Sequence, residues 1–554
     1  MRILPWMMVP FLLFASTVPV AAQVSAATQR SNTAQASSQG CEKLAGLAVP
    51  NASITMAREV DAGAFVAPPA PFTGNDASAF YKTLPAFCRI VAHARPSADS
   101  DIVIEVWLPV SGWNGKLQGM GNGGFAGFID YGELGASILK GYAAVATDTG
   151  HAGSPIDAAW ALGHPEKVAD FGHRGIHEMT RVAKLAVMQL YGTGAKRSYF
   201  AGCSDGGREA LMEAQRYPED YDGILAGAPA NNWTDLLTMA VIDTQALTAT
   251  PASFIPQAKI PAIAKAVVAA CDGLDGVPDG ILNDPRQCRF DPATIECKGD
   301  AESNECLSAA QVTALKQIYA GLKDVQGHSI FPGYLPGAEE GGGGWGLWIT
   351  GPAPAKSLMA YFGNGYYADM VYGKTGWDYK SFALESGLRD AKEKTAAALD
   401  AVNPDLSAFR SRGGKLILFH GWNDPAIPAR STVEYYNNVV AKGGKEATNG
   451  FVRLYMLPGV QHCAGGPGAD VIGLSGTWPD DPRRNVRTAL EEWVEKGMAP
   501  GTLVASKTAG DTPQAAVTMT RLLCPFPELA KYKGSGDPNN AESYACTAAR
   551  VVKR

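Results

Sequence analysis

The segment from residue 197 to residue 218, RSYFAGCSDGGREALMEAQRYP, restricts the fold of this chain more than any other stretch. An apolar run typical of a buried strand leads into GCSDG, which fits the pattern Gly-x-Ser-x-Gly, and a helical pattern then runs to Pro218. Ser204 therefore lies in a sharp turn between a strand and a helix, where side chains at Gly202 or Gly206 would collide with neighbouring backbone. This arrangement indicates a serine nucleophile; the alternative is a plain glycine turn that carries an exposed serine.

Strand and helix patterns alternate on both sides of this turn. Strand patterns fall at residues 101–110, 116–127 (running into a glycine-rich loop), 141–151, 221–230, 415–424 and 451–463, and helical patterns at 175–192 and 486–497. Such alternation predicts an α/β fold with a mostly parallel sheet. The alternation is interrupted from about residue 231 to 410. We therefore predict a core built from residues 41–230 and 411–554, with a large lid domain inserted over residues 231–410.

A serine nucleophile needs a base, and the base needs an acid that orients it. In α/β-hydrolases the triad residues occur along the chain in the order serine, acid, histidine. The base must therefore be one of the histidines that follow Ser204, which are His328, His420 and His462. His328 falls in the insertion, and His420 falls inside a predicted strand, where a core histidine is the better interpretation. His462 lies on a loop after the last strong strand, and Asp424 ends the preceding strand. The sequence thus predicts a triad of Ser204, His462 and Asp424.

Both of the expected reactive residues have a cysteine as a neighbour. Cys203 precedes Ser204, and Cys463 follows His462. A hydrogen bond between Ser204 and His462 would bring the two cysteines within the range of a disulfide. We therefore predict a Cys203–Cys463 bridge that holds the nucleophile and the base together. The alternative is a pair of buried thiols that lie beside these residues by chance.

The first residues are typical of a targeting sequence and not of a folded domain. A positive start, an apolar run over residues 6–20 and small residues before position 23 predict a signal peptide over residues 1–22. A disordered linker rich in Ser, Ala, Gln and Thr is expected over residues 23–40. A membrane anchor is the alternative, but no other stretch is long enough to span a bilayer. The chain has ten cysteines, an even number without a Cys-x-x-Cys pair, which suits disulfides in an exported protein. Its net charge of −6 offers no basic face for nucleic acid.

Six motifs resemble the tannase and feruloyl esterase family, which also includes mono(hydroxyethyl) terephthalate hydrolase. They span nearly the whole mature chain and are GNGGFAG, GYAAVATDTGH, GCSDGGREAL, DGILAGAPA, HGWNDPAIP and GVQHCAGG. The resemblance implies an α/β-hydrolase fold with a lid and hydrolysis of esters at aromatic acyl groups. It also implies an oxyanion hole made by the backbone N–H groups of Asp205 and of Gly124, or of its neighbour Gly123. A glycine-rich loop suits such donors, because it lets the backbone approach a developing oxyanion.

The same resemblance implies five disulfides and a calcium site in the lid. Together with closeness in sequence, it indicates four bridges besides Cys203–Cys463, namely Cys41–Cys88, Cys271–Cys288, Cys297–Cys306 and Cys524–Cys546. The loop CDGLDGVPDGILND carries Asp272, Asp275 and Asp279, which are oxygen ligands of the kind that Ca²⁺ prefers. Their spacing does not match an EF-hand, and spacing alone favours a solvated acidic turn. The resemblance favours a structural Ca²⁺ site completed by the backbone carbonyls of Val277 and Ile281.

These features predict a secreted serine carboxylesterase, periplasmic or extracellular, that acts on small aromatic esters, including esters linked to plant polysaccharide or polyphenols. A feruloyl esterase is the first choice and a tannase the second. A terephthalate monoester hydrolase is the third, because no lid arginine is a convincing partner for a free carboxylate. A non-catalytic binding protein on a hydrolase scaffold and a secreted peptidase are the alternatives from other classes, and the oligomeric state stays open. The lid aromatics that are candidates for the acyl pocket are Trp345, Trp348, Tyr361, Phe362, Tyr366 and Tyr367.

Overall fold

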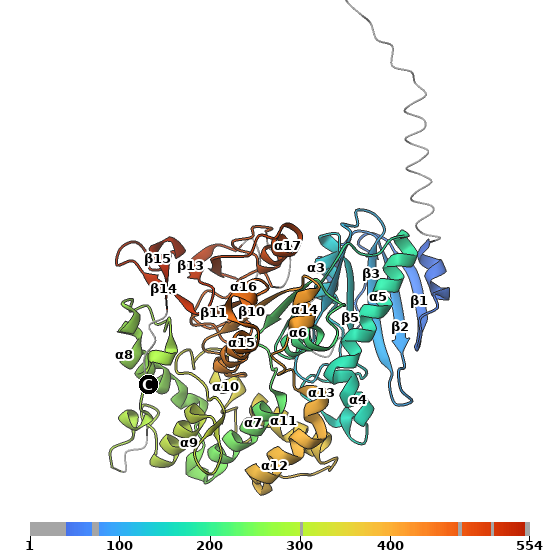
Figure 1. The fold of residues 1–554 in the computed structure, drawn as a ribbon. Helices are drawn as coiled ribbons and strands as arrows, with labels where there is room; N and C mark the ends of the chain where they lie inside the picture. Colours follow the sequence, from blue (N-terminus) through green and yellow to red (C-terminus); the bar gives the residue numbers. More distant parts are fainter. Residues whose placement is uncertain (1–39, 69–76, 300–302, 475–478, 511–514, 549–554) are drawn as a thin grey trace, which may run out of the picture.

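A nine-stranded sheet with the order β1-β2-β3-β5-β4-β6-β7-β10-β11 forms the centre of the molecule (Figure 1). The computed structural model describes residues 40–68, 77–299, 303–474, 479–510 and 515–548. The predicted signal peptide lies outside these residues, and so does the predicted linker except for its last residue. The strands are β1 (Ala52–Val60), β2 (Phe87–Ala94), β3 (Ile102–Pro109), β4 (Lys116–Met120), β5 (Ala143–Thr147), β6 (Arg197–Cys203), β7 (Gly223–Gly227), β10 (Lys415–Gly421) and β11 (Val452–Leu457).

The sheet is parallel where it carries the Ser204 turn and antiparallel toward its N-terminal edge. Strands β5, β4, β6, β7, β10 and β11 pair in parallel, as the alternating patterns predict. Strands β1, β2, β3 and β5 pair antiparallel. The sequence patterns did not single out β1, because this edge strand exposes alternate polar side chains and lacks a continuous apolar run. Since β6, β10 and β11 run in the same direction, the segments that follow these three strands meet at one edge of the sheet.

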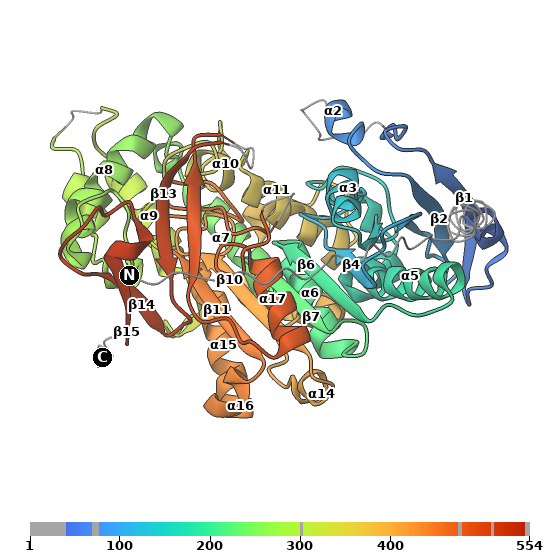
Figure 2. The same cartoon turned by 90° about the horizontal axis from the view of Figure 1, so that it is seen from above.

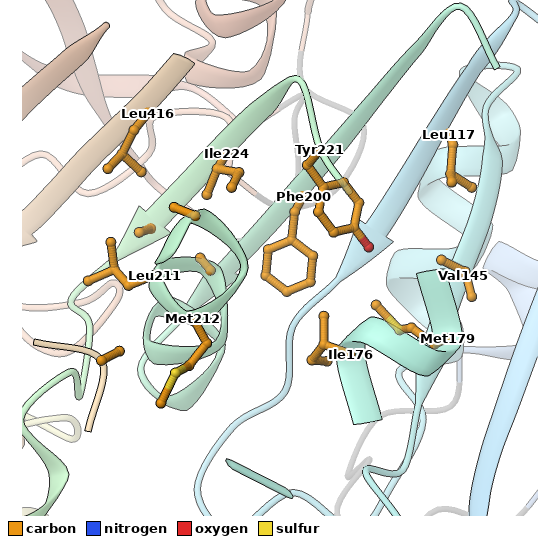
Figure 3. Packing of buried hydrophobic residues seen from close by; sticks show 14 of the residues in the cluster. Leu117, Val145, Ile176, Met179, Phe200, Leu211, Met212, Tyr221, Ile224 and Leu416 are labelled. Atoms are coloured by element: carbon orange, nitrogen blue, oxygen red, sulfur yellow. The ribbon is translucent and has the colours of Figure 1, made fainter. Parts of the chain in front are cut away.

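Helices cover both faces of the central part of the sheet, so its inner strands are buried on two sides. The helices on one face are α5 (Gly175–Tyr191), α6 (Asp205–Arg216) and α15 (Ala429–Gly443), and those on the other are α3 (Tyr131–Leu139) and α17 (Val486–Lys496). Strand β6 shows the division, because successive side chains of a strand point to opposite faces. Phe200 packs with Ile176 of α5 and Leu211 of α6 (Figure 3), whereas Tyr199 and Ala201 pack on the side of α17.

The chain between β7 and β10 forms a helical layer with a core of its own (Figure 1). Its elements are α7 (Trp233–Thr248), α8 (Ile260–Cys271), α9 (Ala309–Ala320), β8 (Leu322–Lys323), β9 (Ser329–Phe331), α10 (Trp345–Trp348), α11 (Leu358–Gly365), α12 (Leu384–Ala391), α13 (Ala397–Leu399) and α14 (Ser407–Ser411). Phe125 and Phe171 from the first half of the chain join this core, whereas Leu406 and Phe409 return to the core beneath the sheet. The inserted layer therefore rests on the glycine-rich loop after β4.

Two hairpins end the described chain beside the insertion (Figure 2). The first hairpin pairs β12 (Leu503–Thr508) with β13 (Val517–Leu523), and the second pairs β14 (Glu528–Tyr532) with β15 (Tyr544–Ala548). Three short α-helices elsewhere in the chain are α2 (Ser78–Tyr81), α4 (Pro165–Ala169) and α16 (Lys445–Asn449). Arg521 of β13 donates to Asp279 of the lid at 2.6 Å, and Asn283 donates to the carbonyl of Ala530. Across the ranges that the structure describes, no helix is both long and apolar enough to cross a membrane.

Candidate active site

Ser204 lies at the turn between β6 and α6, where the sequence predicts it. Its backbone has φ 66° and ψ −122°, a conformation that residues other than glycine rarely adopt. The two flanking glycines make this turn possible. A Cβ on Gly202 would lie 2.4 Å from the carbonyl oxygen of Gly206, and a Cβ on Gly206 would lie 2.8 Å from that of Asn122. Close backbone packing on both sides therefore holds the serine at the carboxyl end of β6.

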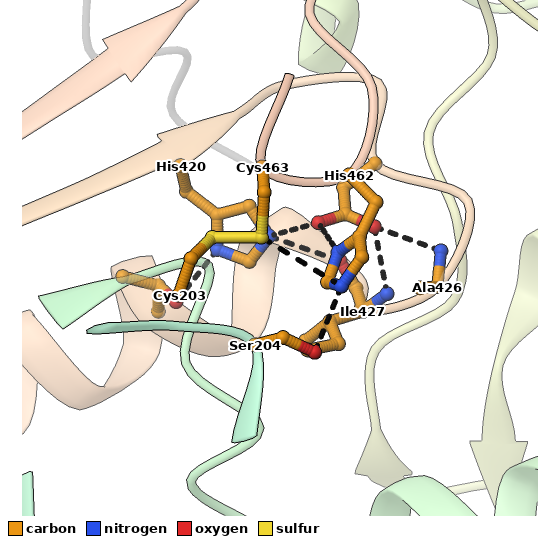
Figure 4. The surroundings of a disulfide bond; sticks show 9 residues. Cys203, Ser204, His420, Ala426, Ile427, His462 and Cys463 are labelled. Carbon is orange, nitrogen blue, oxygen red and sulfur yellow. Dashed lines mark hydrogen bonds and ion pairs between the residues drawn. A yellow bond between two sulfur atoms is a disulfide. The ribbon is translucent and has the colours of Figure 1, made fainter. Parts of the chain in front are cut away.

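The structure brings the three residues of the predicted triad together (Figure 4). His462 Nε2 lies 2.8 Å from Ser204 Oγ, and His462 Nδ1 lies 2.7 Å from Asp424 Oδ2. The side chain of Asp424 is fully buried, while that of His462 keeps 9% of its surface exposed. A continuous series of hydrogen bonds thus joins a hydroxyl, an imidazole and a carboxylate in the order that nucleophilic activation of serine requires.

Four hydrogen-bond donors surround the carboxylate of Asp424. Oδ1 accepts from the backbone N–H groups of Ala426 at 2.8 Å and Ile427 at 2.9 Å. Oδ2 accepts from His462 and also from His420 Nε2 at 3.1 Å. Burial by itself would raise the pKa of Asp424, but His462 and His420 together hold it below its usual range, so the carboxylate stays ionised. His420 is buried in the core as its strand position predicts, and its contact with the acid is not apparent from the sequence.

Cys203 and Cys463 form the predicted disulfide directly beside the triad (Figure 4), with their Cα atoms 6.0 Å apart. The bridge ties the turn after β6 to the loop after β11, and Cys463, like Ser204, has a positive φ of 61°. All five predicted pairings are confirmed. The other four bridges are Cys41–Cys88, Cys271–Cys288, Cys297–Cys306 and Cys524–Cys546.

The backbone N–H groups of Asp205, Gly123 and Gly124 lie close to Ser204 in sequence or in space. None of the three has a hydrogen-bond acceptor among the described residues. Asp205 begins α6, where the N-terminus of the helix adds partial positive charge. Gly124 has φ +60°, and a Cβ there would lie 2.2 Å from the carbonyl oxygen of Pro155, so only glycine fits. The predicted oxyanion donors are therefore free to donate, while their role and the choice between Gly123 and Gly124 stay predictions.

Two buried groups that sequence reasoning missed hold the glycine-rich loop after β4. His151 donates from Nε2 to the carbonyl of Phe125 at 2.7 Å and stacks on Trp160. Glu209 of α6 accepts from the N–H of Asn122 at 2.8 Å. Burial lowers the pKa of His151 to about 4 and raises that of Glu209 well above its usual range. The only sequence signal for His151 is its position at the end of a strand that runs toward the site.

One candidate aromatic residue of the lid contacts the triad directly. Trp348 lies edge-on to the ring of His462, with the ring centroids 4.9 Å apart. Phe362 stacks against Trp348 at 6.4 Å, and Tyr361 is 40% exposed. The remaining candidates are fully buried in the lid core and are Trp345, Tyr366 and Tyr367. Of the six, Trp348 is therefore the one whose ring contacts a residue of the predicted triad.

Comparison with known proteins decides the family. The family model for tannase and feruloyl esterase matches residues 88–547. This chain belongs to the tannase and feruloyl esterase family. Within the family, an uncharacterized esterase of Xanthomonas campestris pv. campestris is 39% identical over 539 residues, covering 93% of this chain and 92% of that protein. A probable feruloyl esterase B-1 of Aspergillus terreus is 34% identical over 471 residues, covering 83% of this chain and 86% of that protein.

Solved structures of this family confirm the predicted α/β-hydrolase fold. The crystal structure of feruloyl esterase B from Aspergillus oryzae matches with a TM-score of 0.82 and 29% identity, covering 92% of this chain and 100% of that one. Tannin acyl hydrolase from Aspergillus niger has the same fold, with a TM-score of 0.72 and 23% identity over 94% of this chain and 96% of that one. As a tannase and feruloyl esterase family member, the chain is a carboxylic ester hydrolase.

The lid loop that is predicted to bind calcium carries its carboxylates on a short turn after α8. These carboxylates accept hydrogen bonds from backbone N–H groups of the loop, and Asp279 also accepts from Arg521. Burial raises the pKa of Asp272 and of Asp275, and repulsion from Asp279 adds to the rise in both. Carboxylate and carbonyl oxygens suit Ca²⁺, so the donor chemistry of the loop fits the ion. Among the described residues, no three acidic, histidine or cysteine side chains lie together as a metal cluster, and calcium binding stays a prediction.

A cavity of about 1140 Å³ lies between this loop and the β14–β15 hairpin, and its lining does not include the triad. Arg286 and Arg289, two of the few lid arginines, line this separate cavity. Arg389 is exposed and pairs with Asp390. Within the described chain, none of these three arginines contacts the triad, which disfavours a substrate that carries a free carboxylate.

Proposed function

We propose that this protein is an exported serine carboxylesterase that hydrolyses esters of aromatic acids, with hydroxycinnamate esters of the feruloyl type as its first substrate class. The hydrogen-bonded series of Ser204, His462 and Asp424 is the observation that carries the proposal. Membership of the tannase and feruloyl esterase family and the relatives named feruloyl esterases support the substrate class. Five disulfides suit an oxidising compartment and support export.

Acylation begins with transfer of the Ser204 proton to His462. Nε2 of His462 takes this proton while Ser204 Oγ attacks the ester carbonyl, and the carboxylate of Asp424 stabilises the imidazolium through Nδ1. The N–H groups of Asp205 and of the glycine-rich loop donate to the oxyanion of the tetrahedral intermediate. His462 then gives the proton to the leaving alcohol, and the acyl group stays on Ser204.

Deacylation follows the same path with water as the nucleophile. His462 removes a proton from water, the oxygen attacks the acyl carbonyl, and collapse of the intermediate releases the acid and returns the proton to Ser204. Trp348 beside His462 offers an aromatic acyl group a ring to pack against. This contact supports an aromatic acyl group over a charged one.

The test is a substrate panel with purified parent protein and a Ser204→Ala variant. The panel contains methyl ferulate, methyl gallate, chlorogenate and the terephthalate monoester. We expect the highest kcat/KM with methyl ferulate or chlorogenate and the lowest with the terephthalate monoester. Ser204→Ala should lower kcat by at least about 10³-fold, because triad members act as a unit. Ser411→Ala changes an exposed serine on α14 and serves as the matched control. Parental activity in the Ser204→Ala protein, or no turnover of any ester, would refute the proposal.

We also propose that the acidic lid loop holds a structural calcium ion. Asp272, Asp275 and Asp279 would supply carboxylate oxygens, and Val277 and Ile281 would supply backbone carbonyls. The ion would offset the burial and, next to it, the repulsion from Asp279 that raise the pKa of Asp272 and Asp275. Its role is to order the lid loop, which a disulfide closes at both ends.

A further inference from the structure

A second histidine contacts the acid of the triad. His420 lies on β10 and is fully buried. Its Nε2 lies 3.1 Å from Asp424 Oδ2 and 3.1 Å from the carbonyl oxygen of Ile427, and its Nδ1 lies 2.8 Å from Thr432 Oγ1 of α15. His462 Nδ1 lies 2.7 Å from the same Oδ2, and Figure 4 marks hydrogen bonds from the rings of both His420 and His462. Two imidazoles therefore share one carboxylate oxygen.

The partners of His420 determine which nitrogen carries hydrogen. Nε2 faces two oxygen acceptors, so it must be protonated and donate. The hydroxyl of Thr432 is fully buried, and in the described part of the chain the ring of His420 is its hydrogen-bond partner. A buried hydroxyl needs an acceptor, so Thr432 donates to Nδ1, which is therefore unprotonated. His420 is thus a neutral imidazole with a fixed tautomer, aimed at the acid.

We propose that His420 is a positioning residue that fixes the rotation of the Asp424 carboxylate, an inference that rests on the proposed esterase mechanism. A carboxylate rotates about its terminal bond in a broad, roughly two-fold potential, so it needs donors on both oxygens to stay in one orientation. Ala426 and Ile427 hold Oδ1 through the backbone. Without His420, the only side chain of the described residues that holds Oδ2 is His462, whose own orientation the acid has to fix.

His420 also divides the negative charge of Oδ2 between two donors. When this donor is removed, the carboxylate presents more charge to His462 and stabilises its protonated form. The acidic limb of the pH profile of kcat should then move to higher pH. Tyr334 also faces this part of the acid loop, and its hydroxyl donates to the carbonyl of Ala426 at 3.3 Å. Burial, Asp243 and Asp424 raise the pKa of Tyr334 well above its usual value, so this group stays neutral.

The experiment compares His420→Ala with His420→Gln in the full-length protein. The alanine removes the donor, whereas the amide nitrogen of glutamine reaches about the position of Nε2 and can replace it. We expect His420→Ala to lower kcat by about 10- to 100-fold with KM changed less than about twofold, in line with loss of an outer partner or a misplacement of about 1 Å. His420→Gln should recover most of this loss and most of the shift in the acidic limb.

Leu418→Ala is the matched control, because it removes another fully buried side chain from the same strand. It should lower Tm but leave kcat and the pH profile of the folded fraction unchanged. If His420→Ala does not fold, Thr432→Val is the second variant. Valine has about the shape of threonine but removes the hydroxyl that donates to Nδ1, so the tautomer of His420 is no longer fixed. The kcat of Thr432→Val should then fall by about 3- to 10-fold. Parental kcat and a parental pH profile in both His420→Ala and Thr432→Val would overturn the inference, as would a loss in His420→Ala that glutamine does not recover.

Ser204→Ala separates this inference from the proposed function. Full activity in that variant would refute the serine esterase mechanism itself. An inactive Ser204→Ala protein together with a fully active His420→Ala protein would refute only the role of His420.

Discussion

His151 shows how a single buried side chain positions a loop at the site. Its Nε2 holds the carbonyl of Phe125 in the glycine-rich loop, while its Nδ1 is buried with no hydrogen-bond partner among the described residues. A proton on Nδ1 would place a charge in an apolar environment, and burial accordingly lowers the pKa of His151 to about 4, with Lys167 adding to the decrease. The neutral ring is therefore the form that holds the loop.

We expect acid to destabilise the protein through His151. An unfolded histidine has a pKa of about 6.5, so the folded chain binds this proton less readily than the unfolded chain does. Its contribution to stability is complete above about pH 6.5 and is lost as the pH falls toward 4, to a limit on the order of 3 kcal/mol. The measurement is the free energy of unfolding between pH 7 and pH 4.5 for the parent and for His151→Gln, which keeps a donor but does not titrate. Equal losses in the two proteins would contradict this account.

Single residues also show which parts of the candidate site can be predicted from the sequence alone. Ser204, Asp424 and His462 are predictable because each follows a strand and because chain order limits the choice of base and acid. The contacts of His420 with the acid and of His151 with the loop are not predictable in the same way. His420 lies near the end of β10 and His151 in the segment that follows β5, and only the three-dimensional packing shows which oxygen each one reaches.

At the scale of elements, buried parallel strands are easy to predict and edge strands are not. Strands β5, β7 and β10 are continuous apolar runs because helices cover both of their faces. Strands β1 and β2, at the N-terminal edge of the sheet and next to it, were not singled out, since antiparallel pairing of β1 with β2 and of β2 with β3 defines them, and not an apolar run. The insertion is recognisable only as a break in the alternation, because its short helices pack on one another and on the loop after β4.

Removal of calcium should destabilise the lid loop. An ion that binds only the native state at a hundred times its Kd stabilises by about 2.7 kcal/mol, so excess chelator should lower Tm by about 2–3 °C in a chain of this size. A double variant, Asp272→Asn with Asp275→Asn, should have a lower Tm that no longer responds to the chelator. Asp291→Asn, outside the loop and at an exposed helix N-cap, is the control. An unchanged melting curve in chelator, with no metal by elemental analysis, would remove the site.

At the scale of the whole molecule, the Cys203–Cys463 bridge joins two parts of the core that lie on either side of the insertion in the sequence. It was predictable because each cysteine adjoins a predicted catalytic residue. The strand pairing of β6 with β7 and of β7 with β10 already brings these parts together without the bridge. We therefore expect its main effect to be on catalytic geometry.

A double change, Cys203→Ala with Cys463→Ala, should still give a folded protein. The bridge closes 260 residues, and a chain-entropy estimate gives on the order of 5 kcal/mol as an upper limit to the lost stability. The kcat of the folded variant should fall by about 100-fold, because Ser204 and His462 are held less well. The matched control, Cys41→Ala with Cys88→Ala, removes a bridge at the N-terminal edge of the sheet and should lower Tm with little change in kcat. A parental kcat in the first variant would show that the bridge has another role.

The connectivity of the bridges also has a consequence for how the chain is assembled. Four bridges join cysteines that are neighbours along the sequence, whereas Cys203–Cys463 encloses two of the others. A chain that enters an oxidising compartment from its N-terminus delivers Cys203 long before Cys463, and Cys271 is the next thiol to arrive. Pairing in order of arrival would join Cys203 to the wrong partner and leave the nucleophile without its base. In such a compartment, the yield of active esterase should therefore depend on a disulfide isomerase that reshuffles this bond.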